Sequence, residues 1–169
     1  MNANWDRSFK LMLSSEGSYV NHPSDFGGRT NLGVTQAVWE NWVGHPVGEK
    51  EMRALTPEKV EPLYKRKFWD ACRCDDLPSG VDYLVFDMAV NSGVGRSAKL
   101  LQRVLGVAQD GAIGPLTLAA AQEMNTSDLI DEFSRVREEF YRSLPTFGVF
   151  GNGWLNRVEH SKASALLIA

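Results

Sequence analysis

Glu16 has the sequence setting of a general acid. It follows Met12 by four residues and Phe9 by seven, so it falls on the apolar stripe of a helix expected over residues 5–16. Burial on that stripe and the negative end of the helix dipole both favour the protonated form of a carboxyl group. A protonated carboxyl group can donate its proton to a leaving glycosidic oxygen. Residue type and position therefore fit glycosidic cleavage.

Asp25 and Thr30 are the candidates for a second catalytic group. Asp25 comes after Glu16 and eight intervening residues, in a polar, Gly-rich segment where a carboxylate stays ionised. A carboxylate with a hydroxyl nearby can hold and activate a water molecule. The alternative interpretation is that Glu16 is a surface residue at a helix end and that Asp25 belongs to an ordinary turn.

These candidates must be positioned by a mostly helical chain. Apolar periodicity and capping residues predict helices over residues 5–16, 35–44, 56–68, 81–90, 97–105, 115–124, 127–144 and 154–167. Pro62 predicts a kink or a restart within the third of these. In segment 81–90 apolar residues occupy nearly every side, which predicts a central helix buried all round. Residues 19–34 are rich in Asn, Pro, Asp, Gly and Thr, which predicts a loop or short hairpin.

The composition excludes several classes of protein. A chain of 169 residues with 43% hydrophobic residues can bury a sufficient core. The net charge of −3 offers no basic face for nucleic acid. Cys72 and Cys74 are one residue apart, too close for a low-strain disulfide and only half of a zinc site, so we expect free thiols. We expect no cofactor and no metal.

Neither a targeting segment nor a membrane span is expected. Residues 1–15 contain only a three-residue apolar run, Leu11 to Leu13, which is shorter than the apolar region of a signal peptide. No stretch approaches the ~20 apolar residues of a transmembrane helix. The expectation is a soluble chain made in the cytoplasm.

Residues 15–35, SEGSYVNHPSDFGGRTNLGVT, resemble the N-terminal signature of the glycosyl hydrolase 108 family. That family comprises lysozyme-like N-acetylmuramidases, common among phage endolysins and bacterial secretion activators. The resemblance continues in YKRKFW at 64–69, in FDMAVNSG at 86–93, and over 101–117, which is similar to the family's C-terminal peptidoglycan-binding region. Ser18 and Phe26 replace a glycine and a proline of the signature, and neither change removes a candidate reactive group.

The resemblance implies a lysozyme-like helical domain that hydrolyses the β-1,4 bond between N-acetylmuramic acid and N-acetylglucosamine in bacterial peptidoglycan. Glu16 matches the family's catalytic Glu. Many phage lysozymes also carry an Asp after eight further residues and a Thr after another five, and Asp25 and Thr30 shorten only the second spacing, by one residue. On this analogy Glu16 is the acid and Asp25 with Thr30 places water. The carboxylates would then stand about 6.5–9.5 Å apart and the reaction would invert the anomeric centre.

Four further residues are candidates for substrate binding. Tyr19 and Asn31 belong to the signature, and Asp87 and Asn91 lie one helical turn apart in the central helix. For Asp87 and Asn91 the alternative is a polar network within the core, because a buried Asp must find hydrogen bonds or a charge partner.

Two other motifs have both a structural and a binding interpretation. The turn from Asp110 to Thr117 is either a tight connection between helices, which we favour, or a wall-binding turn. The basic run Lys65 to Lys67 is either a solvated helix face or a contact for anionic wall polymers.

We expect one domain over residues 1–169, with a catalytic N-terminal part, 1–74, and a helical part, 75–169, that resembles a peptidoglycan-binding region. The substrate cleft is expected between segment 16–35 and the later helices. The expected partner is bacterial peptidoglycan. We expect a monomer, which stays in the host cytoplasm until it is released to the cell wall or periplasm. Two alternatives stay open, a non-catalytic peptidoglycan-binding or secretion-assisting protein and a lytic transglycosylase.

Overall fold

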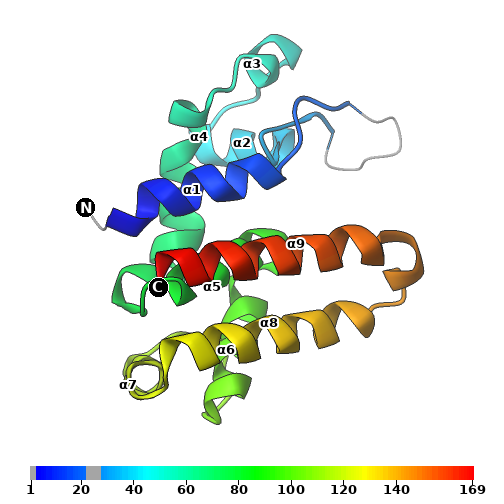
Figure 1. Cartoon of the computed structure of the whole chain (residues 1–169). Helices are drawn as coiled ribbons and strands as arrows, with labels where there is room; N and C mark the ends of the chain where they lie inside the picture. The colour runs from blue at the N-terminus through cyan, green and yellow to red at the C-terminus, as the bar shows by residue number, and fades with distance from the viewer. Residues whose placement is uncertain (1–2, 22–27) are drawn as a thin grey trace. The chain divides into compact units, whose positions relative to one another are not determined.

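The first helix is followed, next in element order, by a small antiparallel sheet, and helices form most of the remaining chain (Figure 1). The computed structural model describes residues 3–21 and 28–169, which contain nine α-helices and one two-stranded sheet. The predicted mainly α fold with a small β excursion after the first helix is confirmed. Asp25 lies outside the described residues. The chain divides into unit 1, Met1–Ser8 with Phe68–Ala169, and unit 2, Phe9–Lys67.

Unit 2 contains the sheet and the early helices. After α1 (Ala3–Ser15), which begins in unit 1, come β1 (Thr30–Asn31), β2 (Val34–Thr35), α2 (Gln36–Val43), α3 (Glu49–Arg53) and α4 (Pro57–Tyr64). As predicted, Thr35 caps α2 by accepting a hydrogen bond from the Val38 N–H, and Gly44 ends that helix with a φ of +81°. Thr56 caps α4 in the same way, with Pro57 as its first residue.

The hairpin between β1 and β2 has a two-residue turn. Thr30 pairs with Thr35 and Asn31 with Val34, which leaves Leu32 and Gly33 at the tip. Both have positive φ, +52° and +76°. Two consecutive positive φ values are typical of the type I′ turn, whose twist matches that of the flanking strands.

Pro62 does not restart the helix that contains it. The helix α4 runs through Pro62 and continues as a π-helix, η1 (Lys65–Asp70). Proline lacks the N–H that would bond to the preceding turn, and a π-helical segment is a local departure from regular α-helical bonding. Where the sequence predicted a kink or a restart, the structure shows a change from α-helical to π-helical bonding. In the basic run, Arg66 and Lys67 are exposed.

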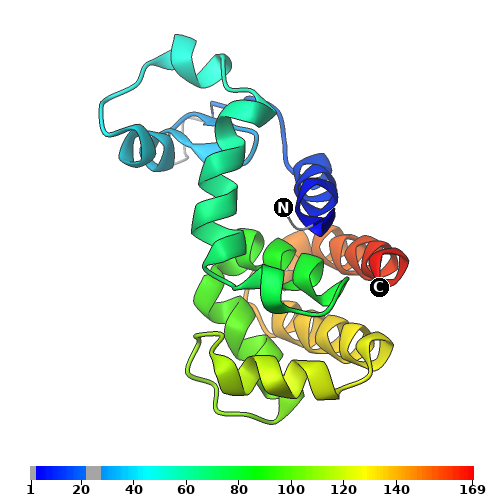
Figure 2. The same ribbon diagram turned by 90° about the vertical axis from the view of Figure 1, so that its left-hand side faces the viewer.

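Unit 1 is built around the central helix. It contains η2 (Cys74–Asp76), α5 (Val81–Ser92), α6 (Val94–Leu105), α7 (Pro115–Glu123), α8 (Thr126–Arg142) and α9 (Phe147–Ile168). Every residue of α5 from Val81 to Ala89 is buried, which confirms the predicted central helix. The helices α8 and α9 run side by side in opposite directions (Figure 1, Figure 2).

Three aromatic rings pack together in the core of unit 1. The rings of Trp5, Trp69 and Phe86 meet edge to face, with centroids 5.3 to 5.6 Å apart. Cys72 and Cys74 are buried and free, as predicted, and burial raises the pKa of the Cys74 thiol. Even α9, with 22 residues the longest helix of the described chain, is not apolar enough to cross a membrane.

Candidate active site

Glu16 lies at the carboxyl end of α1, in unit 2. The helix ends at Ser15, one residue earlier than predicted, but the Glu16 N–H still donates to the Leu13 carbonyl at 3.0 Å. The side chain is partly buried. The end of α1 therefore places a partly buried carboxylate in unit 2.

The tip of the hairpin reaches this carboxylate. A Cβ atom added to Gly33 would lie 2.8 Å from Glu16 Oε2, closer than real Cβ atoms approach, and 3.1 Å from its Cδ. Gly33 thus permits the contact both by its size and by its positive φ. Leu32 beside it also has a left-handed backbone, which costs a non-glycine residue about 1–2 kcal/mol.

Tyr64 connects the turn to two helices. Its hydroxyl donates to the Leu32 carbonyl at 2.8 Å, and its buried ring packs on Phe9 of α1 with centroids 5.8 Å apart. The Tyr64 oxygen would lie 2.6 Å from the same Cβ added to Gly33. The end of α4, the strained turn and the Glu16 carboxylate therefore meet at Gly33.

Thr30 is tied to the chain segment that follows Glu16. Its N–H donates to the Val20 carbonyl and its carbonyl accepts from the Val20 N–H, both at 2.8 Å. These two hydrogen bonds hold β1 beside Val20, in the segment that follows α1. The separation of Glu16 from Asp25 stays a prediction, because Asp25 lies outside the described residues.

Tyr19 and Asn31 differ in how much of their bonding capacity the protein uses. The buried Asn31 donates its amide to the Met52 carbonyl at 2.9 Å, which holds β1 to α3. The Tyr19 ring lies beneath the Arg53 guanidinium, 4.0 Å from the ring centroid. Its hydroxyl is buried and has no hydrogen-bond partner among residues 3–21 and 28–169. A contact between Tyr19 and substrate stays a prediction.

Asp87 forms an ion-paired network inside unit 1. It is fully buried, and its carboxylate contacts Arg137 of α8 and Arg157 of α9, each at 2.8 Å. Burial alone would raise the pKa of Asp87, but the two guanidinium groups outweigh it and hold the pKa below its ordinary value. This geometry supports the core-network interpretation for Asp87.

Asn91 stands at the exposed end of the same network. Its Oδ1 accepts a hydrogen bond from the Tyr141 hydroxyl, and the residue is exposed. A contact between Asn91 and substrate stays a prediction.

The comparisons with known proteins give the family. The family model described as glycosyl hydrolase 108 matches residues 9–93. The chain belongs to the glycosyl hydrolase 108 family. A second model, described as a predicted peptidoglycan domain, matches residues 96–159. Together the two matches indicate a glycoside hydrolase with lysozyme-like activity directed at peptidoglycan.

A solved structure agrees over the whole length of this glycosyl hydrolase 108 chain. The structure titled "Structure of Brucella abortus SagA" is 40% identical in sequence and has a TM-score of 0.89. The similarity covers 99% of this chain and 97% of the SagA chain. Among curated proteins, no match is found.

Within the glycosyl hydrolase 108 match, sequence reasoning found Glu16 but missed Gly33 and Tyr64 as its neighbours. One signal was present: Gly33 follows Leu32 in a segment predicted as a loop or short hairpin, and glycine is typical of the last position of a two-residue hairpin turn. No pattern along the chain connects that turn with Tyr64, which approaches it only through the fold.

The peptidoglycan-domain match contains the turn from Asp110 to Thr117, and its geometry is that of a helix connection. The Gln102 amide donates to Asp110 at 2.7 Å, to the Ala112 carbonyl at 3.0 Å and to Thr117 at 3.2 Å. Its amide oxygen accepts from the Gly111 N–H. The favoured structural interpretation therefore accounts for the polar groups of this turn.

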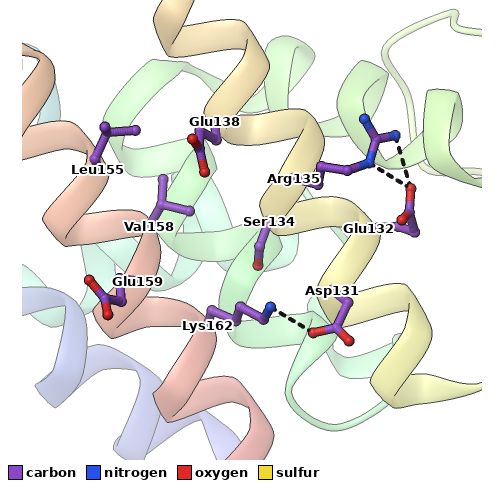
Figure 3. A pocket seen from close by; sticks show the side chains of 9 residues that line it. All are labelled: Asp131, Glu132, Ser134, Arg135, Glu138, Leu155, Val158, Glu159 and Lys162. Atoms are coloured by element: carbon purple, nitrogen blue, oxygen red, sulfur yellow. Dashed lines mark hydrogen bonds and ion pairs between the residues drawn. The ribbon is translucent and has the colours of Figure 1, made fainter.

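The peptidoglycan-domain match also contains a cavity of about 560 Å³ between α8 and α9 (Figure 3). It is lined by Asp131, Glu132, Ser134, Arg135, Glu138, Leu155, Val158, Glu159 and Lys162. Lys162 pairs with Asp131, and Arg135 pairs with Glu132, each at 2.9 Å. Both basic side chains that line the cavity thus form ion pairs with acidic side chains of the same lining. Across the described residues, no three His, Cys, Asp or Glu side chains gather as a metal site requires.

Proposed function

We propose that the chain is an endolysin-type muramidase that hydrolyses the β-1,4 bond between N-acetylmuramic acid and N-acetylglucosamine in bacterial peptidoglycan. The observation that carries the proposal is the Glu16 carboxylate held against the Leu32–Gly33 turn, inside the region that matches glycosyl hydrolase 108. Glycosidases use a carboxylic acid to protonate the leaving oxygen, and we assign this role to Glu16.

Asp25, assisted by Thr30, is proposed to place the attacking water. The Val20–Thr30 bonds support this assignment because they hold Thr30 close in the fold to the segment that leaves Glu16. Water delivered to the face opposite the acid inverts the anomeric centre. Proton NMR of the first-formed product should show the α-anomer, and a first-formed β-anomer would contradict this assignment.

The reaction is tested by the ends of the products. Purified peptidoglycan is digested with the full chain, and the soluble fragments are analysed by mass spectrometry. Hydrolysis by a muramidase yields muramic acid with a free reducing end. Anhydromuramic ends would instead identify a lytic transglycosylase. Binding without released fragments would identify a non-catalytic peptidoglycan-binding protein.

The endolysin role and the monomeric state belong to the same proposal. A monomer produced in the bacterial cytoplasm should leave cells intact until the inner membrane is permeabilised, because its substrate lies beyond that membrane. Turbidity is followed before and after permeabilisation, and size-exclusion chromatography with light scattering gives the mass. Lysis before permeabilisation would contradict the endolysin role. A stable dimer would contradict the monomeric state.

A further inference from the structure

Five aromatic side chains gather where α8 turns into α9, in unit 1. We call this cluster the aromatic platform, and its members are Phe140, Tyr141, Phe147, Phe150 and Trp154. The Trp154 ring lies at its centre: it stacks on Tyr141 with centroids 5.3 Å apart and planes 23° apart. Phe150 and Phe147 flank the same ring, with centroids at 5.7 and 6.5 Å.

The aromatic platform opens toward solvent. Phe150 is 54% exposed, and the neighbouring Val149 is 79% exposed. Of the large apolar side chains that stand exposed in the described chain, Phe150 alone is aromatic. Trp154 is partly exposed, and its indole N–H has no hydrogen-bond partner in the described parts of the molecule. A ring with an unused N–H donor suits a ligand that has both apolar and polar groups.

Glycines in α9 shape the aromatic platform. A Cβ added to Gly151 would lie 2.7 Å from the Phe147 ring. The ring can occupy this position only because Gly151 has no side chain. Gly148 and Gly153 have open space around them. Glycine is a weak helix former, and at these two positions it adds no side chain beside the exposed Phe150.

Two arginines add positive charge at the edge of the aromatic platform. The Arg96 guanidinium lies 4.8 Å from the centroid of Phe140, and that of Arg142 lies 5.3 Å from the centroid of Phe147. Arg142 also pairs with Glu138, whereas Arg96 has no ion pair within residues 3–21 and 28–169. The edge therefore suits an anionic partner.

We infer that the aromatic platform binds the glycan strand of peptidoglycan outside the reacting bond. The faces of pyranose rings carry C–H groups that pack on aromatic rings, and their acetamido carbonyls accept hydrogen bonds such as the one the Trp154 N–H can donate. Muramyl lactyl and peptide carboxylates give the strand the charge that Arg96 attracts. Residues 140–154 also lie within the predicted peptidoglycan domain. The inference rests on the proposed function for the identity of the polymer, but not on the role of Glu16.

The first test measures binding rather than cleavage. The full chain carrying Glu16→Gln is sedimented with insoluble peptidoglycan, with and without Phe150→Ala. Leu167→Ala is the matched control, because Leu167 is 76% exposed on the same helix and lies outside the aromatic platform. Phe150→Ala should weaken binding about five- to tenfold, as expected for the loss of one stacked ring, and Leu167→Ala should leave it unchanged. Equal binding of the three proteins would overturn the inference.

A second measurement follows binding in the chain with its native Trp154 and Phe150. The Trp154 indole signal, assigned through Trp154→Phe among the five tryptophans, is followed by ¹H–¹⁵N NMR. The β-1,4-linked N-acetylglucosamine tetramer should shift this signal, whereas phosphatidylethanolamine–phosphatidylglycerol vesicles should not. A response to vesicles alone, or a dimer abolished by Phe150→Ala, would overturn the inference. Full hydrolytic activity of Glu16→Gln would contradict only the proposed mechanism.

Discussion

At the residue scale, Gly33 has two separate reasons to be glycine. Its φ is positive, and its Cα hydrogen faces the Glu16 carboxylate and the Tyr64 hydroxyl with no room for a methyl group. Gly44 in the same unit has a similar φ but open space around it. Comparing alanine substitutions at Gly33 and Gly44 therefore separates the cost of backbone strain from the effect of displacing Glu16.

Gly33→Ala should lower both stability and activity. We expect about 1–3 kcal/mol less stability, from strain and the steric clash, and a loss of hydrolytic rate of about tenfold or more as Glu16 moves. Gly44→Ala should cost about 1 kcal/mol of stability and leave the rate unchanged. Urea unfolding and peptidoglycan turbidity measure the two effects. Equal rates for both variants would show that Gly33 does not position Glu16.

Tyr64→Phe tests the hydroxyl that holds the strained Leu32. Loss of the hydrogen bond to the Leu32 carbonyl should reduce stability by about 0.5–1.5 kcal/mol, while the ring still packs on Phe9. The hydrolytic rate should fall more than the affinity for substrate, because Tyr64 acts through the turn beside Glu16. Steady-state kinetics on soluble muropeptide chains separate the two, and an unchanged rate would refute the positioning role.

The residues of the site were predictable only where one helix determines them. Glu16 follows Phe9 and Met12 at helical spacing, so its place at the end of α1 could be predicted from the sequence. The contact of Gly33 with Glu16 and Tyr64 brings together three elements, and no local pattern encodes such an approach. The buried hydrogen bond that the Asn31 side-chain amide donates to the Met52 carbonyl was missed for the same reason, since it depends on where α3 packs.

At the element scale, Asp87 joins α5 to α8 and α9. Asp87→Asn should cost about 3–5 kcal/mol at pH 7, because it leaves the buried Arg137 and the partly buried Arg157 without their counter-charge. The control Asp131→Asn removes an exposed pair with Lys162 and should cost less than about 1 kcal/mol. Urea unfolding gives both values, and equal costs would contradict the network's role.

The cost of Asp87→Asn should also depend on pH. The pKa of Asp87 in the folded chain is lowered, so the unfolded chain takes up the proton first as the pH falls. The stabilisation is complete above the unfolded pKa of about 3.9 and is lost as the pH falls through the folded value. The difference between wild type and variant should therefore narrow below about pH 4. A difference independent of pH down to acid unfolding would contradict this.

Two glycines of α9 should respond to alanine in opposite directions. Gly151→Ala pushes a methyl group into the Phe147 ring and should destabilise the chain by about 1–3 kcal/mol. Gly153→Ala meets open space and should stabilise it by about 0.5–1 kcal/mol through helix propensity. Thermal unfolding measures both changes, and the same sign for the two variants would contradict the packing described.

These glycines also explain why α9 was predicted too short. The helix begins at Phe147 rather than at Trp154. The stacking of Trp154 on Tyr141 of α8 and the contact of Phe147 with Arg142 of α8 outweigh the weak helix propensity of the three glycines in α9. The short α3 was missed because four of its five residues are charged and only Met52 is buried. By contrast, the long apolar periods of α5 and α8 were sufficient to predict both helices.

At the scale of the whole molecule, compact units and family regions do not coincide. Unit 2 ends at Lys67, whereas the glycosyl hydrolase 108 match continues to residue 93 and includes α5, the buried centre of unit 1. Arg137 and Arg157, which hold Asp87 of α5, come from the predicted peptidoglycan domain. The peptidoglycan-domain match thus completes the core around a helix of the hydrolase match. The predicted division at residues 74 and 75 stays untested.

The central claim is that the Glu16 carboxyl group is the acid that cleaves peptidoglycan. The most direct test compares the release of reducing ends from purified peptidoglycan by wild type, Glu16→Gln and the exposed control Glu58→Gln, all shown to be folded by circular dichroism. The account predicts a loss of about 10²–10⁴-fold for Glu16→Gln and wild-type rates for Glu58→Gln. A folded Glu16→Gln variant that releases reducing ends at the wild-type rate would contradict it.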